Sequence, residues 1–322
     1  MRRGCYLTGP FGQSQALYTA RNEVKRGRAP KDIVKKQILQ DTKEIIQKQQ
    51  EAGMDYIIDP MFSFYYLFQS FAEQIVTIGP QENWFNNNVF YWRPHIRFPL
   101  AHKTGFTEKY IHLDMLPKDG TAMVILPSPF TLLELSDIQG YKNKESAVKD
   151  LASLFQEEAL SLAAHGVGRI QYDEPALVYK QSLGSLTKED TGLLEYALSI
   201  CGKVKGATTS LHTYFGDAGP LIPYMLDLPV DCIGIDATET RIRDIIKYKF
   251  SDKELAIGLV DGRVTALENP ERLLDQFALL AYHCEPRALW LTPNTGTEYR
   301  GYTHGLNKLR ILDLVQRYFY DD

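Results

Sequence analysis

Cysteine is scarce in this sequence of 322 residues, and long apolar runs are absent. The four cysteines lie far apart, none belongs to a C-x-x-C pair, and each stands in or beside an apolar segment. We therefore expect buried free thiols in a reducing compartment. No apolar run approaches the roughly 20 residues that cross a bilayer, and the first residues lack the apolar core of a signal peptide. These features predict a cytoplasmic protein with no membrane partner.

Excess positive charge is also missing. The chain has 36 lysines and arginines against 40 acidic residues, which gives a formal net charge of -4. A nucleic-acid-binding protein usually carries a basic surface, so we expect no nucleic-acid partner. A hydrophobic fraction of 44% with 24% charged residues is typical of a globular protein that can bury a large core.

Short apolar segments alternate with helical patterns along the whole chain. The predicted strands begin at Cys5, Tyr56, Ala122, Ile170, Ala207, Cys232, Leu255 and Ala288. Several are apolar without alternation, as in parallel strands buried on both faces. Eight strand–helix units over this length predict an α/β fold, a single (β/α)8 TIM barrel of residues 1–322. The alternative is an open doubly wound sheet, but no G-x-G-x-x-G follows the first strand.

Residues 60–120 are rich in aromatic side chains and form a predicted insertion after the second strand. Few basic residues are interleaved with these aromatics, so a lining of the core or of a cleft is favoured over a platform for stacking nucleic-acid bases. Residues 84–91 (W-F-N-N-N-V-F-Y) are predicted to form a lid or ligand wall. Trp84 and Asn88 are its candidate ligand-binding residues.

Residues 171–177 (Q-Y-D-E-P-A-L) are the stretch with the clearest functional signal. They place Asp173 and Glu174 at the exit of a predicted strand, where a proline ends the pairing. In a barrel of parallel strands, catalytic side chains gather at the carboxyl ends of the strands. The two carboxylates could perform acid–base catalysis or bind the ammonium group of an amino acid. The alternative is that one of the two is a solvated loop carboxylate and the other a cap for the next helix.

Other polar residues follow the remaining predicted strands, and we expect them at the same mouth. They are Asp59, His212, Tyr214, Asp236, Asp261, Arg263, Asn294 and Thr295. His212 could be a base, a metal ligand or an ordinary hydrogen-bonded histidine. A zinc site needs three or four ligands, and His212 with Asp236 supplies two without any thiolate. We therefore expect no bound metal.

Five motifs resemble those of the cobalamin-independent methionine synthases, in the superfamily that also contains uroporphyrinogen decarboxylase. They are residues 84–91, 171–178 (Q-Y-D-E-P-A-L-V), 211–217 (L-H-T-Y-F-G-D), 228–231 (L-P-V-D) and 258–263 (G-L-V-D-G-R). That family pairs two barrels and transfers a methyl group from a folate to homocysteine, whose thiol is activated by zinc. The chain is more similar to the N-terminal barrel, here standing alone.

The resemblance also suggests roles for individual positions. His212 matches the histidine of the family's zinc site, while Tyr214 and Thr295 stand where its two cysteines would be, and Asp236 falls near its glutamate. Asp173 matches the carboxylate that holds the substrate's amino group. Residues 15–18 (Q-A-L-Y) replace a basic R-E-L-K stretch that helps the family hold folate polyglutamate. The chain is thus expected to bind no zinc, although a methyl-tetrahydropterin donor is compatible with the resemblance.

These observations lead to one functional hypothesis and two alternatives. The hypothesis is a methyltransferase subunit that presents the methyl donor for transfer to homocysteine on a separate zinc-bearing catalytic chain. The alternatives are a non-catalytic relative that binds an amino acid or pterin, and a metal-free enzyme resembling uroporphyrinogen decarboxylase. The candidate catalytic residues are Asp173, Glu174 and His212, and the candidate substrate-binding residues are Asp236, Asp261, Arg263, Asn294, Trp84, Asn88 and Tyr214.

Overall fold

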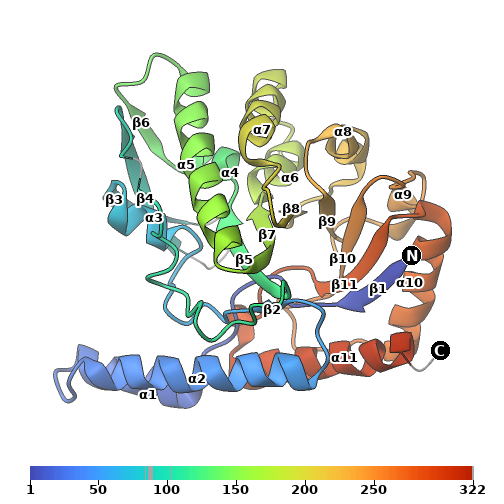
Figure 1. Cartoon of the computed structure of the whole chain (residues 1–322), viewed down its shortest axis with the longest axis horizontal. Coiled ribbons are helices and arrows are strands. Elements are labelled where there is room, and N and C mark those ends of the chain that lie inside the picture. The colour runs from blue at the N-terminus through green and yellow to red at the C-terminus, as the bar shows by residue number, and fades with distance from the viewer. Residues whose placement is uncertain (84, 86–89, 102, 321–322) are drawn as a thin grey trace.

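The computed structural model describes residues 1–83, 85, 90–101 and 103–320. Its centre is a curled sheet of eight parallel strands in the order β1-β11-β10-β9-β8-β7-β5-β2 (Figure 1). The strands are β1 (Arg2–Cys5), β2 (Ile57–Ile58), β5 (Ala122–Pro127), β7 (Val167–Asp173), β8 (Thr208–Thr213), β9 (Cys232–Asp236), β10 (Glu254–Val260) and β11 (Ala288–Pro293). Strands of this sheet that follow one another along the chain therefore mostly lie side by side.

The two ends of the sheet order contact one another just beyond β1. Tyr6 and Tyr56 form an isolated parallel bridge, and the Asp55 amide donates to the Cys5 carbonyl at 2.9 Å. The rings of Tyr6 and Tyr56 also meet edge to face, with centroids 5.6 Å apart. The curl of the sheet thus brings its first and last strands together.

Helices cover the outside of the curled sheet (Figure 1). The long ones are α2 (Asp32–Glu51), α5 (Lys144–Ala164), α7 (Lys188–Cys201), α10 (Pro270–Cys284) and α11 (Tyr302–Tyr320). The short ones are α1 (Gln15–Lys25), α3 (Gln69–Gln74), α4 (Pro129–Glu134), α6 (Pro175–Ser182), α8 (Ile222–Asp227) and α9 (Ile242–Ile245). Asn269 caps α10 by accepting from the Arg272 amide, with Pro270 in the first turn. Among the helices of the described residues, none is long and apolar enough to cross a membrane.

A second, three-stranded sheet stands beside α5. It consists of β3 (Thr77–Asn83), β4 (Phe90–Arg97) and β6 (Asp137–Gln139), with β3 and β4 antiparallel. Residues between β2 and β5 supply two of its strands, and their aromatic rings include fully buried core members. Phe71 and Phe106 both contact Phe155 of α5, with ring centroids 6.0 and 5.7 Å away. Trp84 and Asn88 lie outside the described residues.

All eight predicted strand segments form strands, but two of them begin three residues before the predicted start. β1 begins at Arg2 and not at Cys5, because it pairs with β11 from Arg2 opposite Ala288, and β7 begins at Val167 and not at Ile170, because it pairs with β5 from Val167 opposite Ala122. The prediction also omits the short helices α1, α3, α4 and α6 and the three strands of the second sheet.

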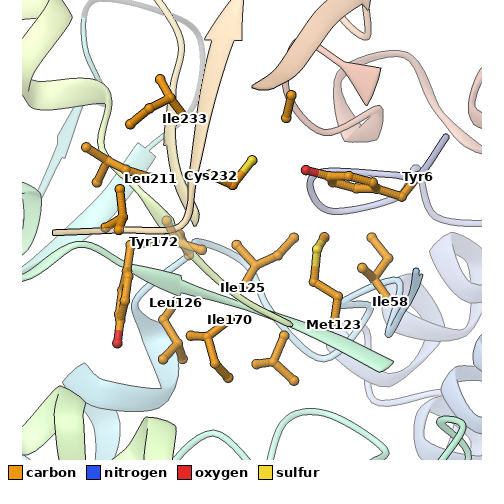
Figure 2. Close-up of a cluster of buried hydrophobic side chains, with 14 of the residues drawn as sticks. Tyr6, Ile58, Met123, Ile125, Leu126, Ile170, Tyr172, Leu211, Cys232 and Ile233 are labelled. Atoms are coloured by element: carbon orange, nitrogen blue, oxygen red, sulfur yellow. The ribbon is translucent and has the colours of Figure 1, made fainter. Parts of the chain in front are cut away.

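The core lies on both faces of the central sheet. Every residue of β5 is buried, and Figure 2 shows side chains of this strand on both sides of the ribbon, as strand geometry requires. At the amino end of the sheet, the fully buried Arg169 forms an ion pair with Glu254. Its guanidinium also lies over the rings of Tyr6, Tyr56 and Trp290, at 5.4, 4.3 and 5.3 Å from their centroids. Packing and a paired charge therefore fill the end opposite the polar strand exits.

Candidate functional site

Five neighbouring strands carry predicted site residues at their carboxyl ends. Asp173 ends β7, Asp236 ends β9 and His212 lies one residue before the end of β8. Asp261 and Asn294 directly follow β10 and β11. Because the strands are parallel, all five residues stand at one edge of the sheet.

Asp173 is buried and held by two side-chain donors. Gln171 donates to Oδ1 at 2.7 Å and Tyr214 donates to Oδ2 at 3.1 Å. Burial raises the pKa of the Asp173 carboxyl to about 7, although these two hydrogen bonds act in the opposite direction. The group can therefore exist in both protonation states near neutral pH.

Asp173 and Tyr214 line a cavity of about 300 Å³. Thr295, Glu298 and Tyr299 line it from the segment after β11, and Arg21 of α1 contributes a cation. The rest of the described lining is largely aromatic and apolar, with Phe11, Phe62, Phe64, Tyr66 and Phe90 among its members. The cavity thus combines two carboxyl groups with aromatic surface, a composition typical of small-molecule sites.

Glu298, a cavity residue that the sequence analysis misses, has an unusual environment. Its Oε2 is shielded from solvent and has no hydrogen-bond partner among the described residues. Burial raises the pKa of this carboxyl to about 8, although hydrogen bonds from its own backbone amide and from the Tyr299 side chain act in the opposite direction, and the charge of Asp173 adds to the rise. In the sequence, the one feature that points to Glu298 as a site residue is its position four residues after Asn294, at the exit of the last strand.

Glu174 faces away from Asp173 and caps a helix. Its Oε1 accepts from the Leu177 amide at 3.0 Å and from the Thr131 hydroxyl at 2.7 Å, and its Oε2 accepts from the Thr131 amide at 3.2 Å. Burial raises the pKa of Glu174 to about 7. These contacts match the helix-cap alternative for the acidic pair, and Glu174 is not among the described residues that line the cavity.

His212 is a buried, neutral histidine. Its Nε2 lies 2.9 Å from the Asn294 carbonyl, so Nε2 carries the proton and donates. Burial lowers the pKa of His212 to about 4. Gly234 makes room for the ring, because a Cβ at this position would lie 2.2 Å from Nδ1. The contacts of His212 are those of the ordinary hydrogen-bonded histidine considered above.

Asn294 links the ends of three strands. Its side-chain nitrogen donates to Asp236 and to Asp261, both at 3.3 Å, and its side-chain oxygen accepts from the Gly262 amide at 2.9 Å. Burial raises the pKa of Asp236 to about 6. For Asp261 burial acts in the same direction, but hydrogen bonds from Arg263 outweigh it and lower the pKa. We call Asp236, Asp261, Arg263 and Asn294 the Asn294 network.

The Asn294 network lies next to the cavity, but its members are not among the described lining residues. The Arg263 guanidinium is 6.0 Å from the centroid of the Phe215 ring. The centroid of that ring is in turn 6.4 Å from the centroid of the Tyr299 ring in the cavity wall. Of the predicted mouth residues that are described, the structure thus brings Asp173, Tyr214 and Thr295 into the cavity. It gathers the other four substrate-site candidates beside it.

Comparison with known proteins places this chain in a family. The model of the cobalamin-independent synthase N-terminal domain matches residues 73–284. The chain belongs to this family. It is 33% identical over 201 residues to a 5-methyltetrahydropteroyltriglutamate–homocysteine methyltransferase of Streptococcus thermophilus, a match that covers 61% of this chain and 26% of that protein. The chain therefore matches about a quarter of the length of such relatives.

A methionine synthase of Sulfurisphaera tokodaii is closer in size to this member of the cobalamin-independent synthase family. It is 23% identical over 260 residues, which cover 78% of this chain and 73% of that protein. The fold is similar to a solved B12-independent methionine synthase of Shewanella sp. W3-18-1 in complex with selenomethionine. The TM-score is 0.77 at 18% identity, with 99% and 97% of the two chains covered. A putative vitamin-B12-independent methionine synthase of Listeria monocytogenes has a TM-score of 0.75, also at 18% identity, with 100% of this chain and 99% of that chain covered.

The residues at the strand exits do not fit the zinc site that the family resemblance implies. The Nε2 of His212 donates to the backbone carbonyl of Asn294, and the hydroxyl of Tyr214 donates to Asp173, so neither is free to bind a metal ion. The four cysteines are buried elsewhere, in β1, α7, β9 and α10. Within the described part of the chain, no group of three or more His, Cys, Asp or Glu side chains could hold a metal ion.

Proposed function

We propose that the chain is a methionine-synthase-type methyltransferase subunit that binds small-molecule ligands in the mouth of one (β/α)8 barrel. In this proposal residues 1–322 form a single barrel domain, and the aromatic segment of residues 60–120 is an insertion. Family membership and the contact between the two ends of the sheet support it. The reaction breaks the carbon–nitrogen bond of a methylated tetrahydropterin and the sulfur–hydrogen bond of homocysteine, and it forms a carbon–sulfur bond while the pterin nitrogen takes up a proton.

The observation that carries the proposal is the position of Asp173 in the cavity. Two donors fix its carboxyl group, while aromatic rings surround the open space in front of it. A buried carboxylate attracts a ligand's ammonium group more strongly than an exposed one, because water screens the pair less. The aromatic lining offers flat surface for a pterin ring. Asp173 would therefore hold the amino group of an amino-acid ligand.

The thiol of homocysteine needs activation, and the described residues contain no zinc site for it. We propose that a separate zinc-bearing methionine synthase chain supplies this site and docks at the cavity mouth. Phe90, which is half exposed and lines the cavity, marks the position of that mouth. The predicted lid of residues 84–91 is the segment we propose for this contact; its members Trp84 and Asn88 lie outside the described residues.

The test is a methyl-transfer assay with 5-methyltetrahydropteroylglutamate and homocysteine. The chain alone should give only background turnover, and addition of a zinc-bearing catalytic barrel should raise turnover at least tenfold above either chain. Asp173→Asn should remove most of the gain, because a charge-assisted hydrogen bond is worth about 1.5–3 kcal/mol. Asp275→Asn, on the exposed face of α10, is the matched control. Full activity of the chain alone, or a partner that works equally well without it, would contradict the proposal.

A second candidate function has its own support. Burial raises the pKa of Asp173 to about 7 and that of Glu298 to about 8, so one cavity holds two groups that can donate or accept a proton near neutral pH. Such a pair suits a metal-free enzyme or a plain amino-acid or pterin binder. Ligand binding that persists while every mixture with the zinc-bearing chain stays at background turnover would favour this candidate.

A further inference from the structure

Glu298 occupies a fixed position in the wall of the cavity. It begins the short 3-10 helix Glu298–Arg300 after β11, and the preceding residue, Thr297, donates its amide to the Pro10 carbonyl at 2.8 Å. The backbone beside it is closely packed, since a Cβ on Gly296 would lie 2.1 Å from the Glu298 Oε2. The glycine thus allows the carboxyl group to lie directly against the end of the strand.

The chain itself leaves this carboxyl group incompletely satisfied. A buried carboxyl oxygen without a hydrogen bond costs free energy, about 1–3 kcal/mol for a neutral group and more for a charged one. The Glu298 Oε2 has no such partner among the described residues, although it belongs to a residue that lines an open cavity. Oxygen atoms of this kind are typical of sites where a ligand supplies the missing donor.

The charged and titratable groups around the cavity determine which kind of ligand could donate a hydrogen bond to Glu298. Asp173, Tyr214 and Tyr299 line it together with Glu298, and Arg21 is the one cation among the described lining residues. The Arg21 guanidinium is already engaged, because it donates to the side chain of Gln13 and to the Phe62 carbonyl. The two carboxyl groups therefore face a cavity in which a positively charged ligand group would be stabilised.

We propose that Glu298 is a second ligand-binding residue, which together with Asp173 receives the primary ammonium group of an amino-acid ligand. This inference deepens the proposed function and rests on it. Glu298 is a neutral acid in the free cavity, and it releases its proton to solvent when the ammonium group donates hydrogen bonds to both carboxylates. Asp173, with a pKa of about 7, is itself about half protonated at pH 7 and loses its remaining proton in the same step. The net change is therefore the release of the Glu298 proton and of the fraction still bound to Asp173, and one ammonium group paired with two carboxylates.

Titration calorimetry of the full chain with L-methionine at pH 7, in two buffers of different ionisation enthalpy, tests this proposal. Wild-type protein should release more than one proton on binding, most of it from Glu298 and about half a proton from Asp173. Glu298→Gln should bind roughly tenfold more weakly and keep only the share released by Asp173. The deaminated analogue 4-(methylthio)butanoate should bind both proteins equally and release no proton. Glu271→Gln, at an exposed position in the first turn of α10, is the control.

The outcomes separate this inference from the proposed function. If Glu298→Gln leaves both affinity and proton release unchanged while Asp173→Asn loses binding, Glu298 is structural and the proposed function stands. If wild-type protein binds neither L-methionine nor L-homocysteine, both proposals fail. Should Glu298→Gln not fold, as judged by its thermal unfolding, Glu298→Asp replaces it. That variant keeps the acid but withdraws it by one methylene, and an unchanged affinity would again overturn the inference.

Discussion

Tyr214 donates a hydrogen bond from its phenol group to Oδ2 of Asp173, at 3.1 Å. Gln171 donates to the other carboxyl oxygen, so both oxygens have a donor before any ligand arrives. The two donors stabilise the ionised form, whereas burial favours the neutral form and raises the pKa to about 7. Tyr214 therefore affects the charge of Asp173 as well as its orientation.

Tyr214→Phe should weaken the binding of a cationic ligand at pH 7 by about three- to tenfold. The substitution removes one hydrogen bond, worth about 0.5–1.5 kcal/mol, and it raises the pKa of Asp173 further, so that less of the carboxyl group is ionised. The ring keeps its contact with Phe215, with centroids 4.8 Å apart. L-methionine affinity measured from pH 6 to 9 should show a smaller deficit at high pH. A deficit that does not change with pH would contradict this reason, and Tyr318→Phe on the exposed face of α11 is the control.

Asp173→Asn should change how stability depends on pH. The folded-state pKa of Asp173, about 7, lies above its ordinary value of 3.8, so the folded state prefers the protonated carboxyl. This contribution to stability is fully present below about pH 4 and is lost as the pH rises through 7. The free energy of unfolding of the variant, relative to wild type, should therefore rise between pH 4.5 and 8, by up to about 4 kcal/mol.

Urea unfolding across that pH range measures this difference. The buried Glu174, Asp236 and Glu298 carboxyls have pKa values raised in the same direction, but they remain in both proteins and so largely cancel in the comparison. For Asp275→Asn, at an exposed position, the free energy of unfolding should depend on pH in the same way as that of wild type. A variant whose stability relative to wild type falls with rising pH would show that Asp173 is ionised and favourably paired in the folded chain.

The central strands could be predicted from the sequence because their signal is local. Residues 122–126 are apolar without interruption and end at a proline, and burial on both faces requires this pattern. β3 gives no such signal, since Thr77–Asn83 is largely exposed and contains Gly79 and Pro80. It exists because it pairs with β4 across a register irregularity. Pairing of this kind depends on the tertiary fold, which the local sequence does not reveal.

Glu174→Ala should destabilise the fold while leaving the site largely intact. The Leu177 amide and both donors of Thr131 lose their acceptor, and loss of a helix cap together with buried unpaired groups costs about 2–4 kcal/mol. Chemical denaturation should show this loss, whereas L-methionine affinity should change less than about threefold. Asn143→Ala removes the exposed cap of α5 and should cost about 1 kcal/mol. Lost affinity at unchanged stability would instead support the catalytic role predicted for Glu174.

The acidic pair shows what the sequence can indicate about a site and what it cannot. Asp173 and Glu174 are adjacent at a strand exit, but successive side chains there point in different directions, so one meets the cavity and the other meets α4. The sequence identifies the pair without assigning the two roles. For Glu298 the sequence offers only its position four residues after Asn294, because its place in the cavity wall depends on the close packing at Gly296 and on the Pro10 carbonyl.

Asn294→Asp should destabilise the chain more as the pH rises. The new carboxyl group keeps the acceptor for the Gly262 amide but replaces an amide donor that lies 3.3 Å from Asp236 and 3.3 Å from Asp261. Three carboxyl groups would then share one buried site, and their repulsion raises the pKa of at least one of them. We expect a loss of about 2–4 kcal/mol in the free energy of unfolding at pH 8 and a clearly smaller loss at pH 5. Asn269→Asp, the same change at the exposed cap of α10, should be nearly neutral, since aspartate caps helices as well as asparagine does. Equal losses for both variants at both pH values would mean that Asn294 does not separate the two acids.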